Sequence, residues 1–115
     1  MAALLIESKA NSGQMRDMLE SLESYIKLAV DVELGVLAGG GTLHADCEAI
    51  LLEHESRQED VWGADWFPFT QQVTFESLIN IRPGQNNFSM EIEDTNTRSK
   101  IEAVVRRLLE GVSYE

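Results

Sequence analysis

The fold prediction depends on one stretch of the chain, Val36-Leu37-Ala38-Gly39-Gly40-Gly41-Thr42-Leu43-His44-Ala45-Asp46-Cys47-Glu48-Ala49-Ile50-Leu51-Leu52-Glu53. Its three consecutive glycines adopt positive φ without steric cost, so they allow a sharp reversal or a close backbone approach. After them, apolar and titratable residues alternate with the period of two that is typical of a strand. We therefore expect a strand from Thr42 to Glu53. Its titratable face carries His44, Asp46 and Glu48.

Length and composition indicate one globular domain covering residues 1–115. Hydrophobic residues make up 43% of the chain and charged residues 25%, which is ordinary for a folded protein of 115 residues. The chain has no secretory signal pattern and no apolar run of membrane-spanning length. We expect a cytoplasmic protein that is not attached to a membrane.

The charge is strongly acidic. Twenty Asp and Glu residues against nine Lys and Arg residues give a formal charge of −11. Binding to nucleic-acid phosphates requires clustered cations, so nucleic acid is not an expected partner. Basic or metal-ion partners fit this charge better, although a negative surface also serves solubility.

Cys47 is the only cysteine, so the chain cannot form an internal disulfide. Its place between apolar residues favours a buried thiol over a nucleophile. On the predicted strand, His44 points to the opposite face and cannot activate the thiol.

The N-terminal third predicts a strand, a helix and a second strand. A short strand spans residues 3–7, and a capping box of Asn11 and Gln14 opens a helix with apolar residues at helical spacing. That helix could continue to Gly39, but the alternation from residue 26 to 33 favours a strand. Gly35 then forms a tight turn that returns residues 36–38.

The remainder predicts further strands and a closing helix. Strands are expected at residues 61–66 and 71–82, with a polar hairpin loop at 54–60. Arg82-Pro83-Gly84-Gln85 matches a type II turn, and residues 88–93 form a short strand or an extended arm. The final helix is capped by Asp94 or Thr95 and stops at Gly111.

This order of elements predicts an α+β domain. A largely antiparallel, meandering sheet carries an N-terminal strand-helix unit, and a C-terminal helix packs on it. If the helices cover one sheet face, the other exposes an apolar patch of Leu78, Ile50 and Leu52, and such a patch implies a homodimer.

Two groups of residues are candidates for binding or chemistry. The first is a polar site of His44, Asp46, Glu48, Asp65, Asn80 and Arg82, in which histidine and carboxylates suit metal binding or acid–base work and Arg82 an anionic substrate. The second is a set of ligand contacts, Trp62, Trp66, Gln85, Asn86 and Asn87, in which indole faces and amides suit a neutral polar ligand. A solvated strand face and two core tryptophans are the structural alternatives.

Four segments resemble a known family: Leu37–Gly41, Leu43–Glu48, Gln58–Trp66, and Ser77–Pro83 with Gln85–Asn87. They are similar to those of small bacterial proteins of unknown function that are frequent in cyanobacteria. The resemblance covers residues 4–111 and implies a bacterial source, with no known activity or cofactor.

Three functions follow from the sequence. We favour a non-enzymatic protein-interaction or regulatory domain that acts as a homodimer, because the chain is acidic and lacks a complete catalytic motif. The alternatives are a small enzyme or metal-binding protein at the polar site, and a small-ligand binding protein at the tryptophans. No cofactor is predicted, and no metal ligand set is established.

Overall fold

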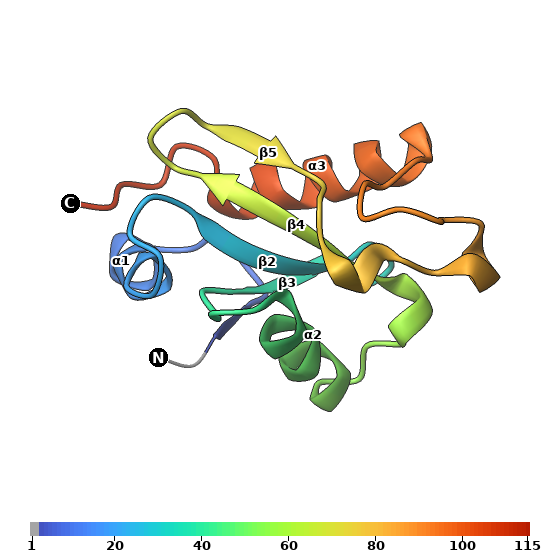
Figure 1. The fold of residues 1–115 in the computed structure, drawn as a ribbon. Coiled ribbons are helices and arrows are strands. Elements are labelled where there is room, and N and C mark those ends of the chain that lie inside the picture. Colours follow the sequence, from blue (N-terminus) through green and yellow to red (C-terminus); the bar gives the residue numbers. More distant parts are fainter. Residues whose placement is uncertain (1–2) are drawn as a thin grey trace.

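The computed structural model describes residues 3–115, and its centre is a five-stranded sheet (Figure 1). The strands are β1 (Leu4–Ile6), β2 (Ile26–Asp31), β3 (Val36–Gly39), β4 (Val61–Phe67) and β5 (Gln72–Thr74). They lie in the order β1-β3-β2-β4-β5, and every neighbouring pair is antiparallel. Together with three α-helices, this sheet confirms the predicted α+β class.

Two helices cover one face of the sheet and bury most of the core. These are α1 (Ser12–Leu19) and α3 (Thr95–Leu109). The capping box of α1 is confirmed, because Asn11 Oδ1 accepts from the Gln14 amide at 2.8 Å and the Asn11 amide donates to Gln14 Oε1 at 3.0 Å. Asp94 caps α3 by accepting from the Thr97 amide at 3.0 Å. Both helices pack their apolar stripes against the same side of the sheet.

The second strand is confirmed where the sequence left a choice between strand and helix. β2 begins at Ile26, and five of its six residues have no exposed surface: Ile26, Leu28, Ala29, Val30 and Asp31. Gly35 has a φ of 70° and closes the turn into β3, so the predicted return of residues 36–38 is also confirmed.

The strand predicted from Thr42 to Glu53 is wrong, because this segment forms the helix α2 (His44–Glu53). Cys47 and Leu51, four residues apart and fully buried, pack on the sheet face opposite α1 and α3. Asp46 Oδ2 accepts from the Leu43 amide at 3.1 Å and fixes the first turn. Figure 1 shows α2 and α3 on opposite sides of the sheet, so both faces carry a helix.

The triple glycine is the corner from which α2 starts. Gly40 has a φ of 98°, and a Cβ on it would lie 2.8 Å from Met18 Cα. No L side chain fits there without moving α1, so the predicted close backbone approach is real.

The strand predicted for residues 71–82 is mostly wrong. It is a strand only at β5, after which Ser77 Oγ accepts from the Ile79 amide at 3.3 Å and opens the 3-10 turn η2 (Leu78–Asn80). The type II turn is also wrong. Residues Pro83–Gln85 form the 3-10 turn η3, and the positive φ of 60° falls on Asn86 instead of Gly84.

The connector at residues 54–60 is not a hairpin loop, because it joins α2 to β4 through the 3-10 turn η1 (Gln58–Asp60). Residues 88–93 contain no regular strand and make only the isolated bridge between Glu76 and Glu91. They therefore correspond to the extended arm.

Asn80 holds this irregular segment against the sheet. The Gly63 amide donates to Asn80 Oδ1 at 2.8 Å, and Asn80 Nδ2 donates to the Gly63 carbonyl at 3.0 Å. The same nitrogen also approaches the carbonyls of Phe75 at 3.3 Å and Met90 at 3.2 Å. A side-chain amide therefore takes the place of a neighbouring strand at the edge of β4.

The predicted apolar patch does not lie on an open sheet face. Ile50 is half-buried on α2 and packs against the buried residues between α2 and the sheet, which include Ala29, Ala38 and Leu51. Leu52 lies on the outer side of the same helix and is 41% exposed. Leu78 lies on η2 and is 71% exposed. The three residues therefore lie on α2 and η2 and not on a sheet strand.

Candidate functional site: a pocket beside the start of α2

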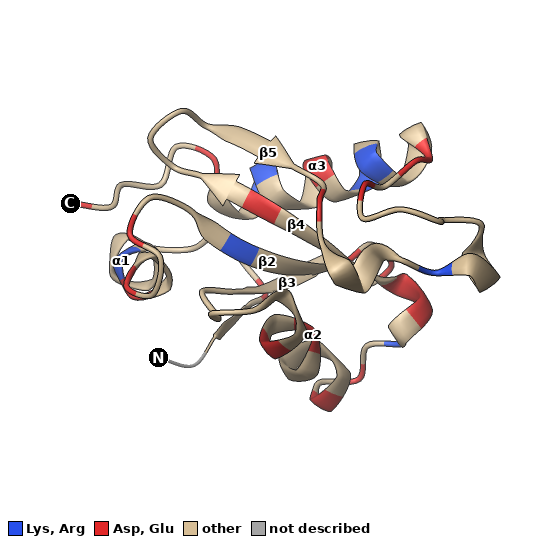
Figure 2. Ribbon diagram, in the orientation of Figure 1, with Lys and Arg blue, Asp and Glu red and all other residues tan. Residues whose placement is uncertain are grey.

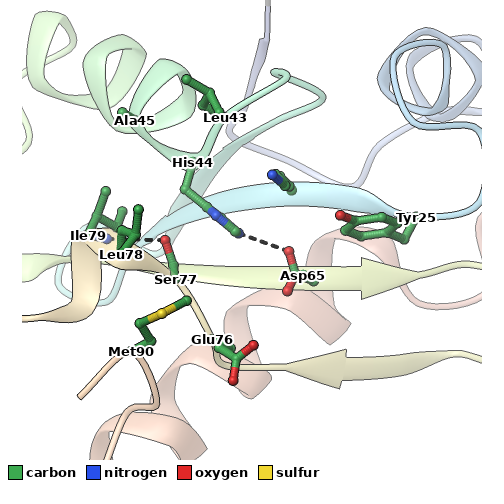
Figure 3. Close-up of a pocket in the computed structure, with 11 residues that line it drawn as sticks. Tyr25, Leu43, His44, Ala45, Asp65, Glu76, Ser77, Leu78, Ile79 and Met90 are labelled. Atoms are coloured by element: carbon green, nitrogen blue, oxygen red, sulfur yellow. Dashed lines mark hydrogen bonds and ion pairs between the residues drawn. The ribbon is translucent and has the colours of Figure 1, made fainter.

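A half-open pocket of about 370 Å³ lies between the start of α2, strands β2 and β4, and residues 76–90 (Figure 3). Its polar lining consists of Tyr25, Lys27, His44, Asp65, Glu76 and Ser77. Its apolar lining consists of Leu43, Ala45, Leu78, Ile79 and Met90. The volume falls within the roughly 300–1,000 Å³ of ordinary ligand pockets.

His44 and Asp65 meet in this pocket. His44 Nε2 lies 2.9 Å from Asp65 Oδ1 and 3.1 Å from the Ala64 carbonyl oxygen. Both of these oxygens are acceptors, so the hydrogen sits on Nε2, and Nδ1 is left as a base in the neutral ring. Thr74 Oγ1 donates to Asp65 Oδ2 at 2.9 Å and orients the carboxylate. His44, Asp65 and Thr74 therefore form one hydrogen-bonded chain beside the pocket.

Three polar groups of the pocket have no intramolecular partner among residues 3–115. Lys27 stands directly opposite Asp65 in the register of β2 and β4, but its ammonium makes neither an ion pair nor a hydrogen bond. The Glu76 carboxylate is likewise unpaired. The Tyr25 ring stacks on Phe67 with centroids 5.1 Å apart, and Figure 3 shows its hydroxyl pointing inward. These groups are available to a ligand.

The other half of the predicted polar site lies outside this pocket. Arg82 Nη2 donates to Glu48 Oε2 at 3.3 Å, while its other nitrogens donate to the carbonyls of Ile79 at 2.9 Å and Gln58 at 2.7 Å. The guanidinium also lies 4.7 Å from the centre of the Trp62 ring. Burial lowers the pKa of Arg82, and Glu48 opposes that shift. Arg82 therefore connects three elements, through Gln58 of η1, Glu48 of α2 and Ile79 of η2.

A second hollow of about 470 Å³ adjoins the pocket. Glu48, Glu59, Ile81 and Arg82 line it, and Leu78 and Ile79 line both hollows. Leu78 and Ile79 therefore separate the pocket that contains His44 and Asp65 from the hollow that contains the Glu48–Arg82 ion pair.

Two further residues of the predicted polar site have structural roles. Asp46 caps α2, and Asn80 pairs with the edge of β4. On a helix, residues two apart point in different directions, so Asp46 does not share a face with His44 and Glu48, which are four residues apart. No group of three His, Cys, Asp or Glu residues in positions 3–115 is arranged to hold a metal ion.

The predicted ligand contacts are spread over the core and the loops. Trp62 and Trp66 are 7% and 0% exposed and pack under α3. Gln85 donates to the Glu59 carbonyl at 2.9 Å, and Asn86 supplies the left-handed residue of its turn. Asn87 is buried, and its Nδ2 donates to the Asn80 and Glu91 carbonyls, both at 2.8 Å. None of these five residues lines the 370 Å³ pocket.

Sequence reasoning missed several lining residues, including Tyr25, Lys27, Glu76 and Met90. Lys27 and Asp65 both occupy polar positions of strands that the sequence predicted correctly. Their direct pairing follows from the register of β2 and β4, which no local pattern specifies.

Cys47 is a buried free thiol, as predicted. Its Sγ donates to the Lys27 carbonyl at 3.3 Å. Burial raises the pKa of Cys47 to about 11, so the thiol stays protonated at neutral pH.

Fold and site together define a small antiparallel α+β domain with a mixed-charge pocket beside its second helix. None of the helices within residues 3–115 is long and apolar enough to cross a membrane. The sequence model of the family "Protein of unknown function (DUF5674)" matches residues 4–108. The chain belongs to this family, which confirms the resemblance to a family of unknown function. No curated protein and no solved structure matches the chain.

Proposed function

We propose that the protein is a non-enzymatic protein-interaction domain that binds a basic, partly apolar segment of a partner protein. The observation that carries the proposal is a set of exposed apolar side chains around the two hollows, which we call the apolar rim: Leu43, Leu78, Ile81 and Met90. Their exposed fractions are 57%, 71%, 44% and 38%. Clustered exposed side chains of this size are typical of binding surfaces.

Charge supports a basic partner. Glu76 and Asp65 line the first hollow, and Glu48 and Glu59 line the second. Each hollow also has one cation, Lys27 in the first and Arg82 in the second, so carboxylates outnumber cations in both. Arg82 is engaged by Glu48 and by carbonyl oxygens. Figure 2 shows acidic positions recurring along α2 and the turn after it. A partner with Lys or Arg beside apolar residues gains steering from this field.

The homodimer expected from the sequence stays a prediction, and it would use the same rim. Two copies that each carry a charge of −11 repel each other, whereas a basic segment is attracted. We therefore assign the rim to a different protein instead of a second copy.

Peptide binding tests this assignment. Three labelled peptides are compared by fluorescence anisotropy: one that alternates Lys and Leu, one that alternates Glu and Leu, and one that alternates Lys and Ser. We expect the first to bind at least about tenfold more tightly than the others, because it alone offers both charge and apolar area.

Leu78→Asp is the matching variant, and Leu34→Asp is its control. Both residues are exposed, at 71% and 55%, but Leu34 lies in the turn between β2 and β3, outside the rim. Burying a leucine side chain is worth roughly 1.5–3 kcal/mol, so Leu78→Asp should weaken the Lys-Leu peptide about tenfold or more. Equal affinities for both variants would contradict the proposal. A wild-type dimer in light scattering that Leu78→Asp dissociates would also overturn it, in favour of a second copy.

A further inference from the structure

The pocket holds opposite charges that do not satisfy each other. Lys27 and Glu76 both line it, yet they form no ion pair within 4.0 Å, and neither has another charged partner in residues 3–115. Asp65, by contrast, is engaged on both oxygens by His44 and Thr74. A ligand therefore meets one free cation and one free carboxylate.

We propose that this pocket binds a small zwitterion of the α-amino acid class with an aliphatic side chain. The ligand carboxylate pairs with Lys27, and its ammonium pairs with Glu76. This goes beyond the proposed function, because it requires no protein partner. The site needs neither a metal ion nor a covalent step.

The unpaired charge of each sign in the pocket, and not its net charge, favours a zwitterion over a simple ion. Lys27 contributes one positive charge and Asp65 and Glu76 contribute two negative ones, while His44 is neutral or positive. A free anion would be repelled by the two carboxylates, whereas a free cation could pair with Glu76 but would leave Lys27 without a partner. A molecule with both charges makes a charge-assisted contact at each end.

Shape and wall chemistry support the aliphatic side chain. Leu43, Leu78, Ile79 and Met90 line the pocket, and Figure 3 shows Leu78 and Met90 across it from Tyr25. Methionine is unbranched and flexible, so Met90 adapts to side chains of different shape. The Tyr25 hydroxyl and the His44 ring add neutral hydrogen-bonding groups.

Calorimetric titration with three matched probes tests the inference. L-Leucine carries both charges, isoamylamine lacks the carboxylate, and isocaproate lacks the ammonium. We expect leucine to bind at least about tenfold more tightly than either analogue, because each analogue leaves one pocket charge unpaired. Amide chemical shifts in a leucine titration should move at Tyr25, Lys27 and Glu76.

Two variants should each weaken the binding of leucine and spare the analogue that lacks the group they pair with. Lys27→Met should weaken leucine about tenfold or more and leave isoamylamine unchanged or tighter. Glu76→Gln should weaken leucine similarly and leave isocaproate unchanged or tighter. Lys100→Met, on the exposed face of α3, is the control and should bind leucine like the wild type.

Three results would overturn the inference. They are no shift of pocket amides at tens of millimolar leucine, analogues that bind as tightly as leucine, or variants that do not spare the matching analogue. Thermal melts of both pocket variants confirm that they are folded before titration. The partner assay uses different probes and the Leu34→Asp control, so either proposal can fail while the other stands.

Discussion

Replacing Asn80 with alanine should destabilise the fold more than any exposed substitution. Asn80 is fully buried, and its amide group pairs with both backbone groups of Gly63 at 2.8 and 3.0 Å. Truncation leaves that N–H and that carbonyl without a partner at the edge of β4. Each unsatisfied buried group costs about 1–3 kcal/mol, so the loss for these two groups should be about 2–6 kcal/mol.

Urea denaturation followed by circular dichroism measures this loss. At about 3 kcal/mol, the melting temperature should also fall by roughly 10–20 °C for a domain of this size. Asn96→Ala is the matched control, because Asn96 is an exposed amide on α3, and the change should stay within about 0.5 kcal/mol. If Asn80→Ala were as stable as this control, water would be replacing the amide, and the edge-pairing role of Asn80 would be refuted.

Two further predictions concern the corner before α2 and the thiol behind it. Gly40→Ala should destabilise the fold by about 2 kcal/mol or more, because the new Cβ would lie 2.8 Å from Met18 Cα and the backbone φ is 98°. Gly84→Ala is the control and should be near neutral, because no atom lies within 4 Å of the new Cβ. Equal urea midpoints for the two variants would disprove the packing argument. Cys47 should react with iodoacetamide at pH 8 at least about a hundredfold more slowly in the folded protein than in urea, because its pKa is raised to about 11. Since the folded pKa lies above the unfolded one, the stability from the protonated thiol is complete below about pH 8.5, declines as pH rises and is lost above about 11, and Cys47→Ala should flatten that decline in alkaline urea titrations. A reactive thiol in the folded state would show that α2 opens readily.

The sequence predicted the elements whose signals are local. The alternation after Ile26 marks β2, and the capping pair of Asn11 and Gln14 marks α1, because each reports short-range geometry. The closing helix has both a cap and an apolar stripe, so its prediction was also correct.

The error at residues 42–53 has a physical cause. Leu43, Ala45 and Cys47 match a period of two, while Cys47 and Leu51 match a helix, and only two of ten helical residues are fully buried. With so few buried positions, periodicity cannot decide between the two. The run of Ala, Leu and Glu residues favours a helix by intrinsic propensity, and this was the missed signal.

The candidate site was predicted only in part. His44 and Asp65 do meet, although through a helix instead of a strand, and Glu48 does reach Arg82. The separation of these two pairs depends on the path of residues 75–87. That path is fixed by buried amides, above all Asn80, and nothing in a local pattern tells a buried asparagine from a solvated one.

The contact between Gly40 and the backbone of Met18 also joins the two sides of the sheet. The corner and α1 occupy touching volumes, so α1 cannot shift without moving the corner from which α2 starts. The position of His44 therefore depends on the packing of α1 on the opposite face. Loosening α1 should disturb the far side of the sheet, so hydrogen exchange at residues 43–46 should rise together with exchange in α1.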